Sequence, residues 1–135
     1  MELKWDESYS VYVKELDEQH KKLFAMINNF YEMLVKGESS SKVLTTTIAE
    51  MKKYALQHFT LEEQIMKLKN YPNLKSHQLR HKEFADKVIN LEEKLQKGGP
   101  ILPGEIAKFL KEWLTNHIKI EDKVYGNYYK SNNLL

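Results

Sequence analysis

Cysteine is absent from this chain of 135 residues, and proline and glycine are scarce, with three and five residues respectively. Without thiolates the protein forms no disulfide and has no zinc-finger or iron–sulfur site built on cysteine. Any metal ion must therefore be bound by nitrogen and oxygen atoms. The few glycines and prolines mark the boundaries of long segments between them.

Long apolar runs and a charge of one sign are missing as well. No stretch approaches the roughly 20 apolar residues of a membrane span, and residues 1–9 do not resemble a signal peptide. The net charge is +2 and charges of both signs alternate along the chain, without the clustered basic stripe of nucleic-acid-binding proteins. We therefore expect a single domain, residues 1–135, in a cytoplasmic protein without a membrane span or a nucleic-acid partner.

Apolar residues recur at spacings of three and four in four segments, which predicts four helices. The expected helices cover residues 17–36, 41–69, 74–97 and 105–125. An N-terminal arm, residues 1–16, is expected to pack on them. Because the connections are short, neighbouring helices should run antiparallel. The predicted fold class is all-α, an up-down-up-down four-helix bundle, and the core of such a bundle is a usual place for a metal site.

Particular residues are expected to end or begin these helices. Gly37 suits the end of the first helix, and Ser39–Ser41 offer an N-cap for the second. Gly126 is expected to end the fourth helix, followed by a frayed tail, and Val124 is expected on its inward face.

All five histidines fall on the expected inward faces, and two carboxylates share those faces. The seven residues are His20, His58, Glu62, His77, His81, His117 and Asp122. One histidine on an apolar stripe is usually an ordinary core residue. However, a stripe covers about a third of a helix surface, so five of five would fall there by chance about once in 250 sequences. Because buried imidazoles and carboxylates are costly unless paired or bound to metal, the set predicts a metal site.

Spacing explains most of this set. Two pairs lie four residues apart, and so one turn apart on one helix face: His58 with Glu62, and His77 with His81. Asp122 lies five residues after His117, a rotation of about 140° on an ideal helix. Pairing these two residues requires a local distortion such as a π-bulge, or the reach of a side chain near the helix end.

Counting ligands favours two metal ions over one. Five imidazoles are more than one ion normally takes, and imidazole with carboxylate suits iron among other first-row metals. Two six-coordinate ions offer roughly twelve positions, of which about eleven are filled by the histidines, two bridging carboxylates and a solvent-derived oxo or hydroxo bridge. One position stays open for a small ligand. Nothing in the sequence indicates a nucleophile or general acid, so no catalytic residue is predicted.

The sequence resembles the bacterial hemerythrins, a family of non-haem di-iron proteins that bind oxygen. Four motifs carry the resemblance, in the family's order: D-E-Q-H at Asp17–His20, H-F-T-L-E-E at His58–Glu63, H-Q-L-R-H at His77–His81, and W-L-T-N-H-I-K-I-E-D at Trp113–Asp122. Trp5 fits the family as well, and the resemblance covers nearly the whole chain. In the family, H-x-x-x-x-D on the last helix is the standard pattern, which accounts for the position of Asp122.

The resemblance implies a role for each histidine. His77, His81 and His117 would hold one iron, whose coordination is then full. His20 and His58 would hold the other iron, which keeps the open position.

The resemblance also implies the cofactor and the activity. Two non-haem irons would be bridged by Glu62, Asp122 and an oxo or hydroxo group. Dioxygen would bind the ferrous iron with the open position, both irons would become ferric, and release would reverse these steps. The expected function is reversible binding of dioxygen for storage, transport or delivery, and not an enzymatic activity. Delivery would require an oxygen-using enzyme as partner; the sequence identifies neither that partner nor the oligomeric state.

An apolar pocket would slow the loss of superoxide or peroxide, which leaves a dead ferric site. The residues placed to line it are Leu23, Phe24, Phe59 and Leu114. Phe59 and Leu114 could equally be ordinary core residues. Gln19 is a candidate for supporting the ligands, whereas Asp17 could support them or cap the first helix.

Two other functions would use the same site. A di-iron peroxidase or nitric-oxide-handling enzyme would use the same open position. An oxygen or redox sensor would need an output domain, for which we expect no room in this chain. The histidine-rich ligand set favours binding over oxygen activation, because carboxylate-rich di-iron oxygenases use more glutamates.

Overall fold

The computed structural model describes residues 3–38, 40–98 and 103–133, with the backbone alone over 119–121. Its elements are η1 (Glu7–Tyr9), α1 (Lys14–Val35), α2 (Ser41–Leu68), α3 (Leu74–Gln96), α4 (Pro103–Trp113), η2 (Leu114–Asp122) and α5 (Lys123–Ser131). The described residues include no strand. The predicted all-α class is therefore confirmed.

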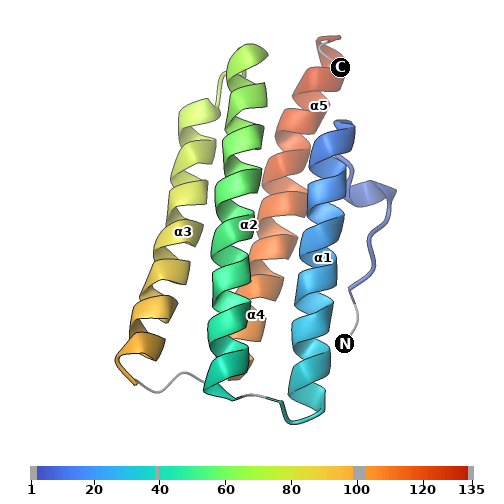
Figure 1. Ribbon diagram of the computed structural model, residues 1–135. Helices are drawn as coiled ribbons and strands as arrows, with labels where there is room; N and C mark the ends of the chain where they lie inside the picture. Colours follow the sequence, from blue (N-terminus) through green and yellow to red (C-terminus); the bar gives the residue numbers. More distant parts are fainter. Residues whose placement is uncertain (1–2, 39, 99–102, 134–135) are drawn as a thin grey trace.

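The helices form an antiparallel four-helix bundle (Figure 1). Three of its rods are α1, α2 and α3, and the fourth is the continuous succession of α4, η2 and α5. Each rod runs opposite to the one before it, so α2 and the fourth rod point the same way. No helix within the described ranges is long and apolar enough to cross a membrane.

Helix ends follow from local chemistry. Gly37 adopts a positive φ of 77° just after α1, its amide donates to the carbonyl of Leu34, and the amide of Glu38 donates to that of Met33. This pair of bonds is the Schellman motif, for which glycine is best suited. The side chain of Ser40 caps α2 by accepting from the amide of Val43. Ser39, also considered for this cap, lies outside the described residues.

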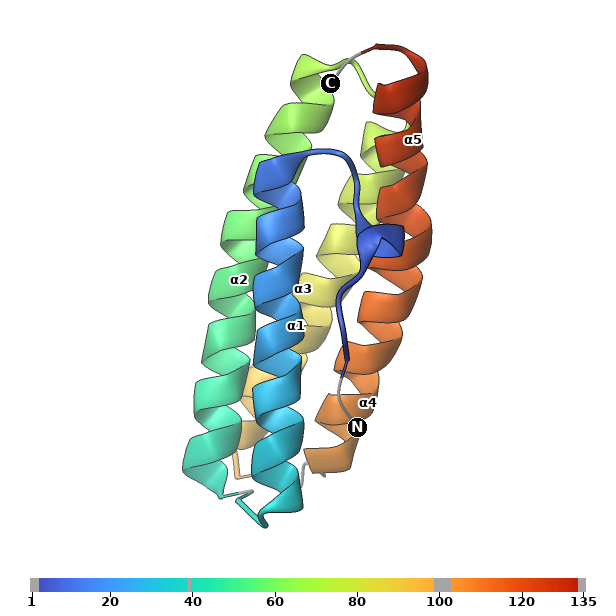
Figure 2. The ribbon, with the colours of Figure 1, turned by 90° about the vertical axis from the view of Figure 1, so that its right-hand side faces the viewer.

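The N-terminal arm lies along the bundle between α1 and the fourth rod (Figure 2). Asp17 holds it, because its carboxylate accepts from Ser10 Oγ at 2.6 Å and from the amide of Val11 at 2.9 Å. Lys123 donates to the carbonyl oxygen of Ser10 at 2.7 Å. With Asp17 in its first turn, α1 begins at Lys14, three residues earlier than predicted.

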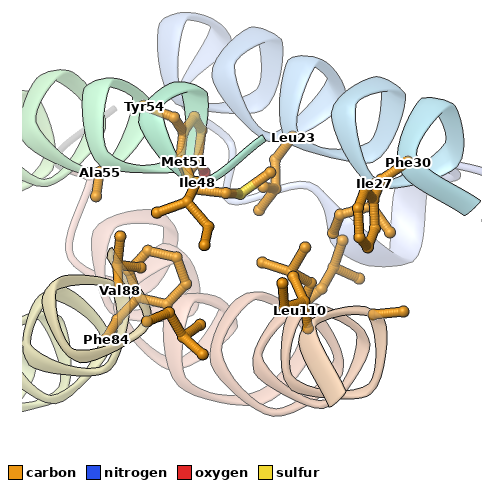
Figure 3. Close-up of a cluster of buried hydrophobic side chains, with 14 of the residues drawn as sticks. Leu23, Ile27, Phe30, Ile48, Met51, Tyr54, Ala55, Phe84, Val88 and Leu110 are labelled. Atoms are coloured by element: carbon orange, nitrogen blue, oxygen red, sulfur yellow. The ribbon is translucent and has the colours of Figure 1, made fainter. Parts of the chain in front are cut away.

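Two clusters of buried apolar side chains fill the bundle. The larger one draws on all four rods (Figure 3). Its labelled members are Leu23, Ile27, Phe30, Ile48, Met51, Tyr54, Ala55, Phe84, Val88 and Leu110. The smaller cluster contains Val11, Leu16, Met66, Tyr71, Tyr125 and Tyr129. The histidines and carboxylates of the predicted site share faces with both clusters.

Two predictions about the fourth helix were wrong. Gly126 does not end it, because α5 continues to Ser131. Gly126 is instead needed for close packing: a Cβ there would lie 2.9 Å from Cα of Val11 in the arm. Val124 is 52% exposed, whereas Tyr125 is buried, because the π-helical turns of η2 rotate the residues after it relative to an ideal α-helix.

Candidate metal centre

The seven predicted site residues come together inside the bundle from all four rods. Each exposes at most 5% of its surface. They comprise His20 on α1, His58 and Glu62 on α2, His77 and His81 on α3, and His117 and Asp122 on η2. A buried set of this composition, with no exposed member, is unusual for residues that normally face water.

Glu62 lies between two groups of histidines, with one oxygen toward each. Its Oε1 is 2.8 Å from Nε2 of His77 and 2.9 Å from Nε2 of His81. Its Oε2 is 2.9 Å from Nε2 of His58 and 3.8 Å from Nε2 of His20. The two carboxylate oxygens of one side chain therefore serve different sides of the site.

Asp122 repeats this arrangement from the opposite rod. Its Oδ1 is 2.8 Å from Nε2 of His77 and 3.0 Å from Nε2 of His117. Its Oδ2 is 3.1 Å from Nε2 of His20. Both carboxylates thus face both groups of imidazoles.

The π-helical segment explains how Asp122 reaches the site. η2 spans Leu114–Asp122 and contains both His117 and Asp122. Hydrogen bonds in a π-helix join residues five apart, so these two residues lie about one turn apart on the same face. The distortion considered from the spacing is therefore present, and π-helical turns are often found at functional sites.

Hydrogen bonds from outside the set orient two of the imidazoles. Nδ1 of His58 lies 2.6 Å from Oε1 of Gln19, and Nδ1 of His81 lies 2.8 Å from Oε2 of Glu63. Since these oxygens accept, each Nδ1 carries a proton, and Nε2 is the nitrogen that faces the carboxylate of Glu62. Metal-binding histidines are typically held in this way.

Tyr125 supports a carboxylate from the side of the smaller cluster. Its hydroxyl donates to Oε2 of Glu62 at 3.2 Å. Burial, with the negative charges of Glu62 and Asp122, raises the pKa of Tyr125 well above its usual value, so the phenol stays protonated as a donor.

The charges of the site compensate one another without metal. Burial opposes the protonation of His20, but hydrogen bonds to Asp122 and Glu62 outweigh it and raise its pKa to about 9. The same balance raises the pKa of His77 to about 9. Burial would raise the pKa of Glu62 and of Asp122, yet the neighbouring histidines hold both below their ordinary values. For His58, burial prevails and lowers the pKa.

The donor atoms fit a pair of metal ions. They fall into two groups, each with its ligand atoms within 4.8 Å of one another: Glu62, His77, His81 and His117, and His20, His58, Glu62 and Asp122. Imidazole nitrogen with carboxylate oxygen is a donor set that first-row metals such as iron accept. Protonating all five imidazoles against two carboxylates would bury an excess of positive charge, whereas neutral imidazoles direct lone pairs inward that metal ions can accept.

The residues predicted to line a pocket are buried near this centre. Leu23, Phe24, Phe59 and Leu114 expose 0%, 3%, 6% and 0% of their surface. The ring of Phe59 stacks on that of His81, with centroids 3.8 Å apart. All four belong to the larger apolar cluster, so they place a dry environment beside the imidazoles.

Two residues that contact the centre were not among the residues predicted from the sequence. Glu63 supports His81, and its position directly after Glu62 in the second motif was the available signal. Tyr54 lies one turn before His58 and stacks on it, with ring centroids 5.1 Å apart and planes 12° from parallel. Its spacing of four residues could have placed it on the same face.

The chain was compared with known families and proteins. The family described as "Hemerythrin HHE cation binding domain" matches residues 11–129. A myohemerythrin of Theromyzon tessulatum is 36% identical over 121 residues, covering 90% of this chain and 88% of the relative. A bacteriohemerythrin of Methylococcus capsulatus is 29% identical over 110 residues, covering 82% of each.

A solved structure gives the same result. The structure described as wild-type hemerythrin superimposes with a TM-score of 0.83 at 25% identity, covering 93% of this chain and 95% of the other. The family match spans most of the chain, and several relatives exceed the identity at which family membership is secure. With the fold and the buried histidine–carboxylate cluster described above, these findings show that the chain belongs to the hemerythrin family.

Proposed function

We propose that this protein binds dioxygen reversibly at two non-haem irons held between the four rods of the bundle. The observation that carries the proposal is the position of the two carboxylates. Glu62 and Asp122 each direct one oxygen toward one group of histidines and the other oxygen toward the second group. This is the arrangement that two metal ions sharing both carboxylates require.

The two groups of histidines are unequal. In this proposal three imidazoles, from His77, His81 and His117, hold one iron, and only two, from His20 and His58, hold the other. With Glu62, Asp122 and a solvent-derived oxo or hydroxo group as shared ligands, an iron held by two imidazoles would keep one position for a small ligand, whereas the iron held by three would be full. The iron pair supplies the electrons that bound dioxygen takes up and gives back on release.

Neighbouring side chains keep the proposed iron ligands in position. Gln19 and Glu63 fix the imidazoles of His58 and His81, and Tyr125 donates a hydrogen bond to Glu62. Apolar side chains such as Leu114 exclude water from the space beside the imidazoles. Exclusion of water disfavours the escape of charged oxygen species, since an ion leaving into an apolar space is poorly solvated.

The proposal is tested by loading the iron-free protein with ferrous iron without air, and then cycling it between oxygen and argon. A carrier gives an oxygen-to-iron charge-transfer band that appears and disappears over several cycles. Irreversible oxidation in the first cycle, together with turnover of added peroxide, would contradict reversible binding and indicate a peroxidase. The double variant His77→Ala/His117→Ala is the control and should fail to give the band.

A further inference from the structure

The hydroxyl group of Tyr54 is buried without a protein partner. The residue exposes 8% of its surface, and none of the described residues forms a hydrogen bond with its Oη. A buried hydroxyl without a partner is unfavourable, and most such groups in proteins are paired. Figure 3 shows the Tyr54 ring inside the bundle beside Met51. The hydroxyl therefore has an unused capacity to donate within the core.

The direction of the helices shows on which side of the histidines Tyr54 lies. Tyr54 lies four residues before His58 on α2, and Leu114 lies three residues before His117 on the fourth rod, which runs the same way. Leu23 lies three residues after His20, but α1 runs the opposite way. All three residues are therefore displaced in the same direction along the bundle, by about 4.5–6 Å from their histidines.

Tyr54 is thus a polar member of the larger apolar cluster that lies beside the imidazole of His58. Its ring stacks on His58, which together with His20 forms the group with fewer nitrogen ligands. Leu23 and Leu114 of the same apolar cluster offer no acceptor, and the thioether sulfur of Met51 is only a weak one that forms no hydrogen bond with Tyr54. No described residue therefore supplies an acceptor for this hydroxyl, and a ligand bound beside His58 can supply one.

We propose that the Tyr54 hydroxyl donates a hydrogen bond to the small ligand bound beside His20 and His58. This inference rests on the proposed function and deepens it, because it assigns a specificity-determining residue to the ligand position. The hydroxyl favours ligands that keep an acceptor atom free after binding the metal, such as dioxygen or azide. It also slows their release.

Azide binding to the oxidised, iron-loaded protein tests the proposal directly. Tyr54→Phe removes only Oη, and we expect it to weaken azide binding about tenfold, as loss of one hydrogen bond to an anion does. The matched control is Tyr129→Phe, whose hydroxyl is also buried and unpartnered within the described structure but belongs to the smaller cluster. This control should bind azide as the unchanged protein does. Equal affinity of Tyr54→Phe and the unchanged protein would overturn the inference.

A second measurement separates a ligand contact from a structural role. The iron-free Tyr54→Phe protein should unfold at a urea concentration no lower than the iron-free unchanged protein, since no protein hydrogen bond is lost. A lower midpoint with unchanged azide affinity would assign the hydroxyl to the fold and overturn the proposal. If the unchanged protein failed to take up iron or to cycle with oxygen, the proposed function would fail first. If it cycled normally while Tyr54→Phe behaved identically, only this inference would fail.

Discussion

Individual side chains around the centre act through the atoms they hold in place. Gln19 contacts none of the carboxylates, but its Oε1 accepts from Nδ1 of His58 at 2.6 Å. That bond fixes both the tautomer and the ring angle of the imidazole, and similar outer hydrogen bonds in metal proteins change metal affinity markedly.

We expect Gln19→Met to weaken metal binding about 10–100-fold. Methionine has a similar size but offers no comparable acceptor to His58. Competition with a coloured chelator measures the affinity. The control Gln19→Glu retains an acceptor and should lose much less. Equal affinity of Gln19→Met and the unchanged protein would show that His58 needs no orientation.

Leu114 combines packing with protection of the site. It is fully buried, three residues before His117. Leu114→Ala should destabilise the protein by about 2–5 kcal/mol, the usual cost of such a truncation, and should speed the oxidation of the oxygenated protein by admitting water.

Leu110→Ala is the matched control for this prediction. Leu110 is 2% exposed but lies one turn further from the centre on α4. Leu110→Ala should lower the free energy of unfolding by a similar amount, but it should not speed the oxidation of the oxygenated protein. Urea unfolding and the decay of the oxygen band measure the two effects. A comparable acceleration in both variants would deny Leu114 a protective role.

At the scale of elements, the fourth rod depends on a close approach to the arm. Gly126 lies within α5, and a Cβ there would meet Cα of Val11 at 2.9 Å and its carbonyl oxygen at 3.0 Å. Both are backbone atoms, so the contact cannot be relieved by a side-chain rotation. Glycine is thus required by packing, although it is a poor helix former.

Gly126→Ala should therefore destabilise the protein by about 1–3 kcal/mol, although alanine normally favours a helix. Gly104→Ala is the control, because among the described residues no atom beyond its chain neighbours and its own helix backbone lies within 4 Å of a Cβ on Gly104 in α4. That change should be neutral or stabilising by up to about 1 kcal/mol. Thermal unfolding of both variants decides the matter. A gain in stability for Gly126→Ala would show that the arm does not pack there.

The same elements show what sequence patterns can and cannot predict. Apolar spacing predicted the four-helix bundle because each rod buries one face along most of its length. The spacing of Asp122 left two alternatives, a π-bulge and the reach of a side chain near the helix end, and the spacing alone could not choose between them because a π-helical turn depends on contacts between rods. Gly126 was misread because a glycine that ends a helix and one that admits a neighbouring chain look alike in sequence. Asn133, with a φ of 54°, lies where the helix actually ends.

Site residues were easier to find than the groups around them. Histidines and carboxylates on apolar stripes stand out because burying them is costly. Tyr54 did not stand out, since a tyrosine on an inward face is usually core. Its stacking on His58 and the absence of a described partner for its hydroxyl together distinguish it.

For the molecule as a whole, the site links stability to pH. In the iron-free protein the pKa values of His20 and His77 are about 9, against about 6.5 when unfolded. Their contribution to stability is complete below about pH 6.5 and is lost as pH rises through about 9. The lowered pKa values of Glu62 and Asp122 matter at acid pH. Their contribution to stability is lost as the pH falls below about 4. The pKa of His58 is lowered in the folded protein, so His58 also reduces the stability as the pH falls below about 6.5.

We therefore expect the iron-free protein to be most stable near pH 6.5 and to lose stability toward pH 9. Metal ligation requires neutral imidazole, so iron binding should displace the extra protons of His20 and His77. The iron-loaded protein should therefore not lose stability between about pH 6.5 and 9. Urea unfolding across this pH range, with and without iron, measures both effects. Iron-free stability that rose toward pH 9 would show that these histidines are not protonated in the fold.

The central claim is that the two carboxylates are shared by a pair of metal ions. An anaerobic titration of the iron-free protein with ferrous iron, followed by removal of loose metal and a count of iron per chain, tests it most directly. We expect two irons per chain, one for each of the two groups of ligand atoms. A ratio of one, or none, would contradict it.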